Sequence, residues 1–126
     1  MATIGIVCEY NPFHKGHLLH INSTKAALGA DSTHVCVMSG DYVQRGEAAL
    51  YNKFARAEAA CLCGANLVVE LPLPWCLSSA EGFARGAVGL LGALAVITSA
   101  SAVSAAAPTG LTGWRRLCWI RALPPR

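Results

Sequence analysis

The sequence predicts an α/β fold in which helices cover a parallel sheet. Three short apolar runs, at residues 2–8, 33–38 and 66–71, are rich in β-branched side chains and have the length of strands. Each run is followed by a longer segment with apolar residues at helical spacing. Strands that alternate with helices in this way pair in parallel through right-handed crossovers, so the order βαβαβα is expected.

The first strand and helix flank the most distinctive segment of the chain. Residues 2–8 are almost continuously apolar, which is typical of a central parallel strand covered on both faces. The helix is expected to begin near Gly16, because Leu18 and Ile21 recur at helical spacing. Gly29 is a suitable end for this helix, since glycine readily adopts the left-handed conformation of a helix C-cap.

The second and third units repeat this order. The strand at 33–38 leads into a polar loop, and a helix is expected over residues 52–63, ending at Gly64. The strand at 66–71 is followed by Pro72, which cannot donate to a strand ladder.

The third helix is expected to begin at a capping box. Ser78 and Glu81 have the spacing of that motif, and Phe83 and Leu91 continue the apolar face of the helix. Trp75, which precedes the helix, is expected to pack against it rather than to stack on a nucleic-acid base.

Residues 9–17 join the first strand to the first helix and carry the motif H-x-G-H in His14, Gly16 and His17. Gly16 leaves room for a phosphate to approach the backbone, where the first helical amides present the positive end of the helix dipole. Two imidazoles three residues apart can donate hydrogen bonds to phosphate oxygens as negative charge develops on them. The motif therefore suits nucleotidyl transfer at the carboxyl end of the first strand.

The sequence leaves alternative roles open for these histidines. Incidental surface groups beside a turn would produce the same short motif. A zinc site could use His14, His17 and His20, but no Cys or carboxylate stands beside them at ligand spacing, so no metal ligand is assigned. His20 could face a nucleotide or be a partly buried structural residue.

Composition bounds the chain to one domain at most. An apolar content of 54% with 13% charged residues in 126 residues argues against disorder. The net charge of +3 is unevenly distributed, because all seven carboxylates lie between Glu9 and Glu81, whereas only arginines are charged after residue 85. The six cysteines lie mostly in apolar runs without a C-x-x-C pair, so reduced core thiols of a cytoplasmic protein are expected.

Five segments together resemble the amino-terminal half of the bacterial tRNA(Met) cytidine acetate ligase family, which belongs to the H-x-G-H nucleotidyltransferase superfamily. In chain order they are residues 9–17 (EYNPFHKGH), 38–47 (MSGDYVQRGE), 53–58 (KFARAE), 69–72 (VELP) and 79–81 (SAE). The likeness covers about residues 2–94. It implies a Rossmann-like parallel sheet of the H-x-G-H nucleotidyltransferase type, incomplete in this chain.

The resemblance also implies a reaction. Acetate is activated by ATP as acetyl-adenylate with release of pyrophosphate, and the acetyl group passes to the wobble cytidine of elongator tRNA(Met). The expected ligands are ATP as a substrate, Mg²⁺ as its counter-ion, acetate and this tRNA. Two alternatives stay open, namely another H-x-G-H adenylyltransferase acting on a small phosphorylated acceptor, and an inactive fragment that at most binds a nucleotide.

Site residues follow from the resemblance by position. His14 and His17 are the expected catalytic residues. Five further side chains are candidates for contacts with substrate or tRNA, although charges on a loop or helix are often merely solvated; they are Asp41, Gln44, Arg45, Lys53 and Arg56. The expected ATP-binding segment is Val7, Cys8, Glu9, Tyr10, Asn11, Pro12, Phe13, His14, Lys15, Gly16, His17, Leu18, Leu19 and His20.

Beyond residue 94 the sequence changes in character and no further strand is expected. We predict a partial nucleotidyltransferase-like domain over residues 1–94 and a low-complexity tail over 95–126, either disordered or an aberrant product of a frameshift. The uncharged stretch 86–114 is long enough to span a bilayer. Its Ala, Ser, Thr and Gly content makes insertion weak, so no membrane segment is expected.

Overall fold

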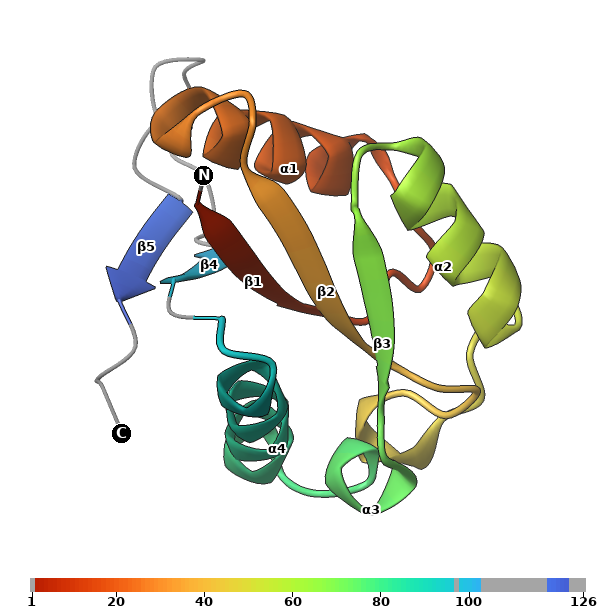
Figure 1. Ribbon diagram of the computed structural model, residues 1–126. Coiled ribbons are helices and arrows are strands. Elements are labelled where there is room, and N and C mark those ends of the chain that lie inside the picture. Colours follow the sequence, from red (N-terminus) through yellow and green to blue (C-terminus); the bar gives the residue numbers. More distant parts are fainter. Residues whose placement is uncertain (1, 97, 103–117, 123–126) are drawn as a thin grey trace, which may run out of the picture.

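A computed structural model of the chain describes residues 2–96, 98–102 and 118–122 (Figure 1). The predicted α/β class and the order βαβαβα are confirmed, and two more strands follow. The elements are β1 (Thr3–Cys8), α1 (Lys15–Leu28), β2 (Thr33–Ser39), the 3-10 turn η1 (Gln44–Gly46), α2 (Lys53–Leu62), β3 (Leu67–Leu71), α3 (Leu73–Cys76), α4 (Ala80–Ala93), β4 (Thr98–Ala102) and β5 (Cys118–Ala122).

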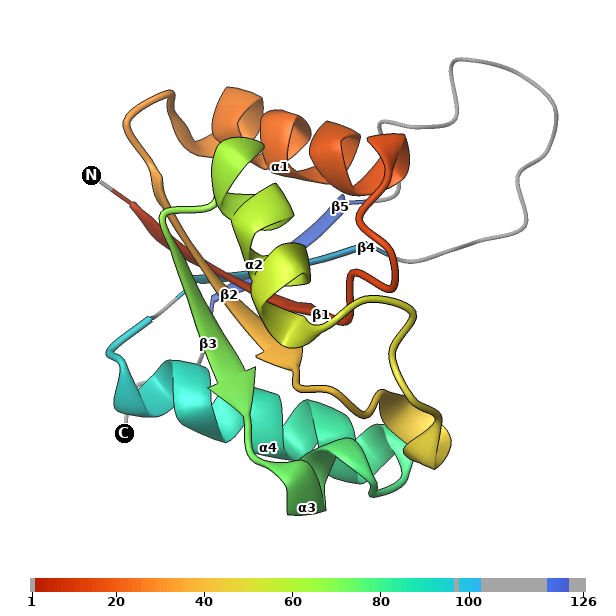
Figure 2. The same cartoon turned by 90° about the vertical axis from the view of Figure 1, so that its right-hand side faces the viewer.

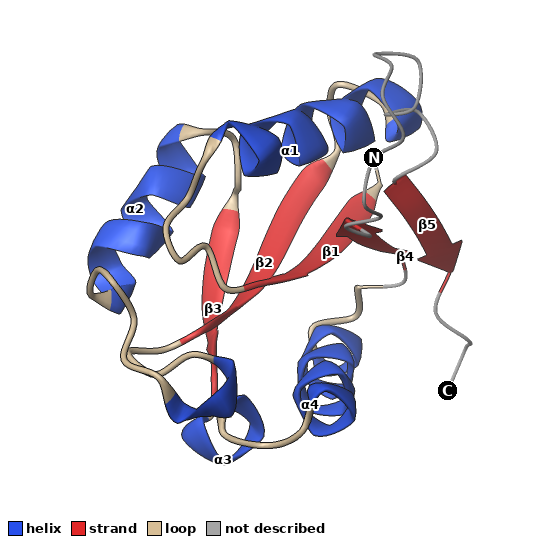
Figure 3. Cartoon of the chain, turned by 180° about the vertical axis from the view of Figure 1, so that it is seen from behind, coloured by secondary structure: helices blue, strands red, loops and turns tan. Residues whose placement is uncertain are grey.

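The strands form one sheet in the order β3-β2-β1-β4-β5. β1 pairs in parallel with both β2 and β4, and β2 pairs in parallel with β3, whereas β5 pairs antiparallel with β4. The sheet edge formed by β4 and β5 is seen from behind in Figure 3. Because the chain places β2 and β3 on one side of β1 and β4 on the other, the winding of the sheet reverses at β1.

Helices cover both faces of the sheet, so the core has two parts (Figure 2). On one face, Ile4 and Ile6 of β1 pack with residues of α1 and α2, including the fully buried Ile21 and Ala60. On the other face, strand residues such as Val37 pack against α3 and α4. This two-sided burial accounts for the near-continuous apolar character of β1 and β2.

Polar residues begin the three longer helices α1, α2 and α4, and the predicted helix ends are close to those observed. Gly29 follows α1 with φ +110°, in agreement with the expected cap. Asn52 caps α2 by accepting a hydrogen bond from the N–H of Ala55. The cap of α4 is Ser79, which accepts from Gly82, rather than the expected Ser78.

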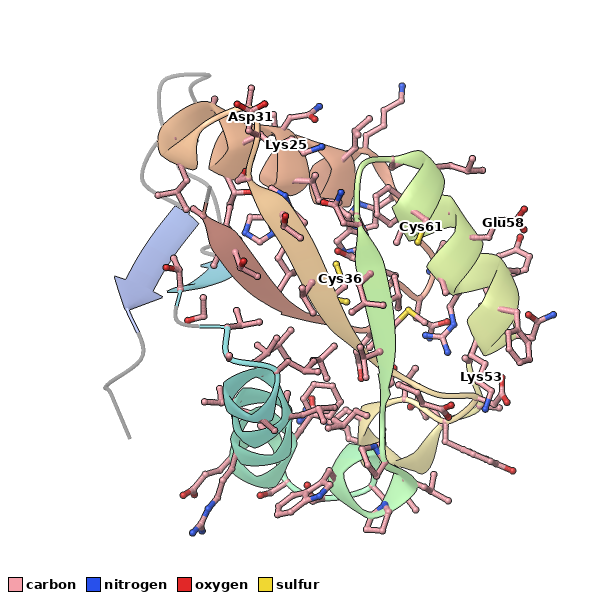
Figure 4. All side chains as sticks on the ribbon, viewed as in Figure 1. Lys25, Asp31, Cys36, Lys53, Glu58 and Cys61 are labelled. Carbon is pink, nitrogen blue, oxygen red and sulfur yellow. The ribbon has the colours of Figure 1, made fainter. Side chains whose placement is uncertain are left out.

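The segment after β3 differs from the expectation of a simple strand end. Residues Leu73–Cys76 form the short helix α3, with Pro72 at its N-cap. Trp75 packs against α4 as predicted, since its ring carbons lie 2.5 Å from where a Cβ would stand on Gly86. The cysteines were predicted to be core thiols. This is confirmed for Cys36 and Cys76, which are buried, whereas Cys61 is exposed on α2 (Figure 4).

The expectation that no strand follows residue 94 is wrong. β4 pairs with β1 from Ile4↔Thr98 to Ile6↔Ala100, and Ala100 is buried in the core. The small and polar residues of β4 lack the apolar pattern of a strand. Their strand conformation is set by pairing with β1 and β5 rather than by their own propensity. Residues 103–117 and 123–126 of the predicted tail lie outside the described residues, and the boundary at 94 stays a prediction.

Candidate functional site

The carboxyl end of β1 opens into a cavity of about 640 Å³. The cavity lies at the strand where the winding of the sheet reverses, which is where open α/β sheets commonly bind ligands. Its walls come from β1 and the following loop, from the start of α1, from the segment after β2 and from α4. The lining residues are Val7, Cys8, Glu9, Tyr10, Asn11, Pro12, His14, His17, Val43, Gln44, Arg45, Glu47 and Phe83.

His14 and His17 form both a wall of this cavity and the cap of α1. His14 is the N-cap residue, and its Nδ1 accepts a hydrogen bond of 3.1 Å from the N–H of Gly16. In return, the N–H of His14 donates to Nδ1 of His17 over 3.2 Å. The two rings stack with centroids 3.7 Å apart and planes inclined by 23°. Two imidazoles thus take the roles that Ser and Glu have in an ordinary capping box.

This cap fixes which nitrogen of each ring is available to a ligand. Because both Nδ1 atoms accept main-chain hydrogen bonds, the proton of each neutral imidazole is assigned to Nε2. The two histidines therefore offer two Nε2–H donors in the cavity wall. Such a pair is suited to binding the oxygens of a phosphate or another anion.

His17 is neutral at physiological pH. Its pKa is lowered from 6.5 to about 4, chiefly by burial and then by the nearby His14 and His20. A neutral ring keeps Nδ1 free to accept from His14, which protonation would prevent. His17 thus serves as a hydrogen-bond donor through Nε2 rather than as a cation.

Gly16 has a different local role from the one expected. Its N–H, expected to meet a phosphate, already donates to His14. A Cβ on Gly16 would lie 2.9 Å from Cε1 of His14, so the bare Cα makes room for the capping ring.

Tyr10 supports the histidine pair from inside the fold. It is buried and has the left-handed backbone conformation with φ +47°, which is costly for a bulky residue. Its ring lies edge-on to Phe13 and His17, with centroids 4.8 Å and 4.9 Å away. The hydroxyl is 3.5 Å from Sγ of Cys36, and burial raises the pKa of Tyr10 well above its usual range, so it stays protonated.

Two hydrogen bonds join the loop after β1 to the loop after β2. Oε1 of Glu9 accepts from the N–H of Gln44, and Oδ1 of Asn11 accepts from the N–H of Leu50, each over 2.7 Å. These bonds bring the Gln44 segment to the same cavity as the histidines. The proximity of the two loops agrees with the expectation that loops at the carboxyl ends of parallel strands converge.

Arg45 is the cavity-lining residue best placed to meet an anion. It is exposed, and no hydrogen bond or ion pair of its guanidinium is found within the described residues. Its backbone has φ +75°, a left-handed conformation inside the 3-10 turn. A free guanidinium at the cavity can therefore pair with a phosphate or carboxylate.

Arg56 lies elsewhere than expected. Its side chain is only 2% exposed. Nε donates to the carbonyl of Tyr51 over 3.0 Å, and the terminal nitrogens donate to the carbonyls of Glu9, Ser39 and Gly40. Because main-chain carbonyls surround this guanidinium, the structure contradicts the expectation that Arg56 contacts triphosphate or tRNA.

Lys53 and Asp41 lie outside the 640 Å³ cavity. Nζ of Lys53 forms an ion pair of 2.8 Å with Glu70, which raises the pKa of Lys53. Asp41 accepts from the N–H of Lys53 over 2.9 Å and therefore helps to begin α2. Figure 4 shows Lys53 at the start of α2.

Six residues of the expected ATP-binding segment do not line this cavity. They are Phe13, Lys15, Gly16, Leu18, Leu19 and His20. Phe13 packs on Tyr10, and Lys15 and Leu19 are exposed on α1. His20 is buried, and burial lowers its pKa, so of the two alternatives the structure favours a structural histidine.

Comparison with known proteins places this site in a family. Residues 1–106 match the family model described as HIGH Nucleotidyl Transferase. The chain belongs to this family. This confirms the superfamily that the sequence resemblance implied.

Similar members of the HIGH family carry a more specific name. A protein from Acetivibrio thermocellus is 50% identical over 97 residues, or 77% of this chain and 23% of its own length. One from Syntrophotalea carbinolica is 53% identical over 96 residues, which cover 76% of this chain and 23% of the relative. Both are named tRNA(Met) cytidine acetate ligase. The chain thus spans about a quarter of the length of these relatives.

A solved structure gives the same match in space. Thermotoga maritima TmcAL, crystallised with alpha-thio ATP, superimposes with a TM-score of 0.71 at 48% identity. The match covers 76% of this chain and 23% of the Thermotoga chain.

Some cavity residues of this family member were not predicted as site residues. Val43 and Glu47 flank the predicted Gln44 and Arg45, and Phe83 reaches the cavity from α4. The helical spacing of Phe83 and Leu91 indicated only a buried face. Within the described residues no group of three metal-ligating side chains occurs, and none of the helices is long and apolar enough to cross a membrane.

Proposed function

We propose that this chain carries the ATP-phosphate site of a tRNA(Met) cytidine acetate ligase. The names of relatives at about 50% identity support the reaction, and the alpha-thio ATP bound to Thermotoga TmcAL supports the nucleotide. The observation that carries the proposal is the capping pair of histidines, because it leaves Nε2 of both rings for an anion in the cavity.

The proposed first step is formation of acetyl-adenylate. A carboxylate oxygen of acetate attacks the α-phosphorus of ATP, a new P–O bond forms, and the bond from this phosphorus to the bridging oxygen breaks to release pyrophosphate. Negative charge increases on the leaving pyrophosphate and on the phosphoryl oxygens. The Nε2–H groups of His14 and His17 stabilise this charge by hydrogen bonding, and the α1 dipole adds to the effect.

The second step transfers the acetyl group to tRNA. The exocyclic amine of the wobble cytidine attacks the acetyl carbonyl, the bond to AMP breaks, and the nitrogen loses a proton. We assign no residue of this chain to that step. Elongator tRNA(Met) and acetate are the proposed partners, which places the proposed reaction in the cytoplasm.

Mg²⁺ is proposed to accompany the triphosphate. Mg²⁺ in nucleotide sites is bound by phosphates, waters and one or two carboxylates rather than by a cage of protein ligands. Glu47 fits this pattern, since it lines the cavity and its carboxylate has no hydrogen-bond partner among the described residues. Mg²⁺ would shield the phosphate charge there, while Arg45 is the proposed direct partner of a phosphate or of the acetate carboxylate.

Asp41, Gln44 and Lys53 have weaker support as substrate residues. Gln44 lines the cavity, and its side chain is proposed to orient a substrate. The carboxylate of Asp41 accepts from the main chain of Lys53, and the ammonium of Lys53 is paired with Glu70. A contact of either residue with tRNA would therefore have to form alongside these interactions.

The proposal is tested first by calorimetric titration of the chain with ATP and Mg²⁺. His17→Ala should abolish measurable binding, whereas Asn22→Ala, on the exposed surface of α1, should leave it unchanged. If the unmutated chain does not bind ATP, the proposed site is not sufficient in this chain. Acetate-dependent exchange of pyrophosphate into ATP tests the reaction, and exchange that does not need acetate would favour a different acceptor.

A further inference from the structure

We propose that Arg56 is a positioning residue that holds two loops at one cavity without touching the substrate. The nucleotide loop is defined here as residues 9–14, after β1, and the second loop as residues 40–52, after β2. This inference rests on the proposed function, because it accounts for how the Gln44 segment comes to face the histidine pair.

Arg56 lies in the fork where β1 and β2 separate. The last pair in their ladder is Cys8↔Met38, after which Glu9 enters the nucleotide loop and Ser39 leads to Gly40 and the second loop. Main-chain groups beyond a ladder need other partners when they are buried. The guanidinium supplies them, since it donates to the carbonyls of Glu9, Ser39 and Gly40.

The chemistry of arginine suits this fork. The only ion pair found within the described residues joins Lys53 to Glu70, so the buried charge of Arg56 is balanced by carbonyl dipoles rather than by a carboxylate. A planar guanidinium has five donors at fixed angles and can bridge several carbonyls at once. A lysine ammonium keeps the charge but has no planar set of donors at fixed angles, so it cannot span the same set of carbonyls.

The effect of Arg56 reaches the cavity through Glu9. The carbonyl of Glu9 accepts from Arg56, and its carboxylate accepts from the N–H of Gln44 over 2.7 Å. Glu9 is therefore held through its main-chain carbonyl and through its carboxylate. Its carboxylate in turn fixes Gln44 beside Arg45 in the cavity wall. Loss of Arg56 should free Glu9 and loosen the Gln44 segment, while the cores on the two faces of the sheet keep their packing.

Amide hydrogen exchange tests this coupling without any ligand. We expect Arg56→Ala to speed exchange at the N–H groups of Gln44 and Leu50 by about tenfold or more, as local opening becomes easier. The amides of β2 should keep their protection. Arg56→Lys should show an effect of the same sign at both positions. The matched control is Glu58→Gln, because Glu58 is exposed on the outer side of the same helix (Figure 4).

Two exchange results would overturn the proposal. Unchanged protection of Gln44 would show that Arg56 does not hold the loops together. A uniform rise in exchange across β2 would show a general structural role instead. If Arg56→Ala does not fold, the same criteria are applied to Arg56→Lys.

ATP titration then links the coupling to the site. Arg56→Ala should bind ATP about tenfold more weakly, and dilute guanidinium ion should restore part of the lost affinity. Glu58→Gln should bind ATP as the unmutated chain does, with or without guanidinium. Unchanged ATP affinity, or the lack of any rescue, would contradict a positioning role. If the unmutated chain binds no ATP, the proposed function fails, whereas the exchange result still decides the role of Arg56.

Discussion

The imidazole of His14 lies directly against the Cα of Gly16. A Cβ at position 16 would stand 2.9 Å from Cε1 and 3.1 Å from Nδ1 of that ring. The same ring accepts the N–H of Gly16 and thereby caps α1. The glycine of the H-x-G-H motif thus leaves room for the capping ring of the neighbouring histidine, whether or not a ligand is bound.

Gly16→Ala is therefore expected to destabilise the chain, although alanine is the better helix former. The methyl group would displace the His14 ring, and loss of such a cap costs about 1 kcal/mol of unfolding free energy. ATP binding should weaken as well. Urea unfolding and ATP titration measure both effects, with Asn22→Ala on the same helix as the control. A Gly16→Ala variant more stable than the unmutated chain would contradict this prediction.

Substitution of His14 can separate capping from ligand binding. His14→Asn should retain most of the stability, because asparagine is a good N-cap residue, but it should lose ATP affinity with the Nε2–H donor. His14→Ala should lose the affinity and also about 1 kcal/mol of unfolding free energy. Urea unfolding distinguishes the two variants. Equal stabilities would indicate that the observed cap does not contribute to folding.

Acidification is expected to destabilise the fold through its buried histidines. Burial lowers the pKa of His17 from 6.5 to about 4, and burial also lowers the pKa values of His20 and His34. The unfolded chain then binds these protons more readily than the folded chain. Their contribution to stability is complete above pH 6.5 and decreases as the pH falls from 6.5 toward 4.

Urea unfolding at several pH values between 7.5 and 4.5, roughly the range in which these groups titrate, measures this dependence. His17→Asn should reduce the loss of stability on acidification, because one of the depressed groups is removed. The control is Asn22→Ala, which should keep the full dependence. An identical pH dependence in His17→Asn would show that the environment of His17 does not disfavour its charged form.

Two glycines of α4 should respond in opposite ways to the same substitution. A Cβ on Gly86 would lie 2.5 Å from Cγ of Trp75, whereas a Cβ on Gly89 would meet nothing within 4 Å. Gly86→Ala should therefore cost about 1–3 kcal/mol through displacement of the indole. Gly89→Ala should stabilise the chain by about 1 kcal/mol through helix propensity. Circular dichroism during urea unfolding compares them, and equal shifts would contradict the observed Trp75 contact.

Sequence patterns predicted the parts of the fold whose signals are local. The apolar runs marked β1 and β2 because helices cover both faces of these strands, whereas β3 was marked by its valines although Leu67 and Glu70 are exposed. Gly29 marked the end of α1. β4 escaped prediction because Ser99 and Ala100 are too small to show a strand pattern, and pairing with β1 and β5 holds them in the sheet. α3 was missed because its prolines indicated a break, although proline suits the first turn of a helix.

The same distinction applies to the candidate site. The cavity position of the H-x-G-H histidines was predictable, because their motif joins the first strand directly to a helix. Phe83 was not, because its place in the cavity wall depends on the packing of α4. For Arg56, helical spacing placed the side chain near Lys53, but a fork of carbonyls formed by two distant strands cannot be read from one helix.

The contacts of Arg56 also determine when, during synthesis of the chain, the two loops can be joined. The histidines, β1 and β2 leave the ribosome before α2, so a nascent chain that ends short of residue 56 contains the whole H-x-G-H motif without the side chain that ties its loop to the next one. Since this contact spans 47 residues of sequence, it is non-local and cannot form before the segment that carries Arg56 has been synthesised. Under our proposal, the newborn polypeptide reaches its full affinity for ATP when α2 docks, and not when the motif itself is translated.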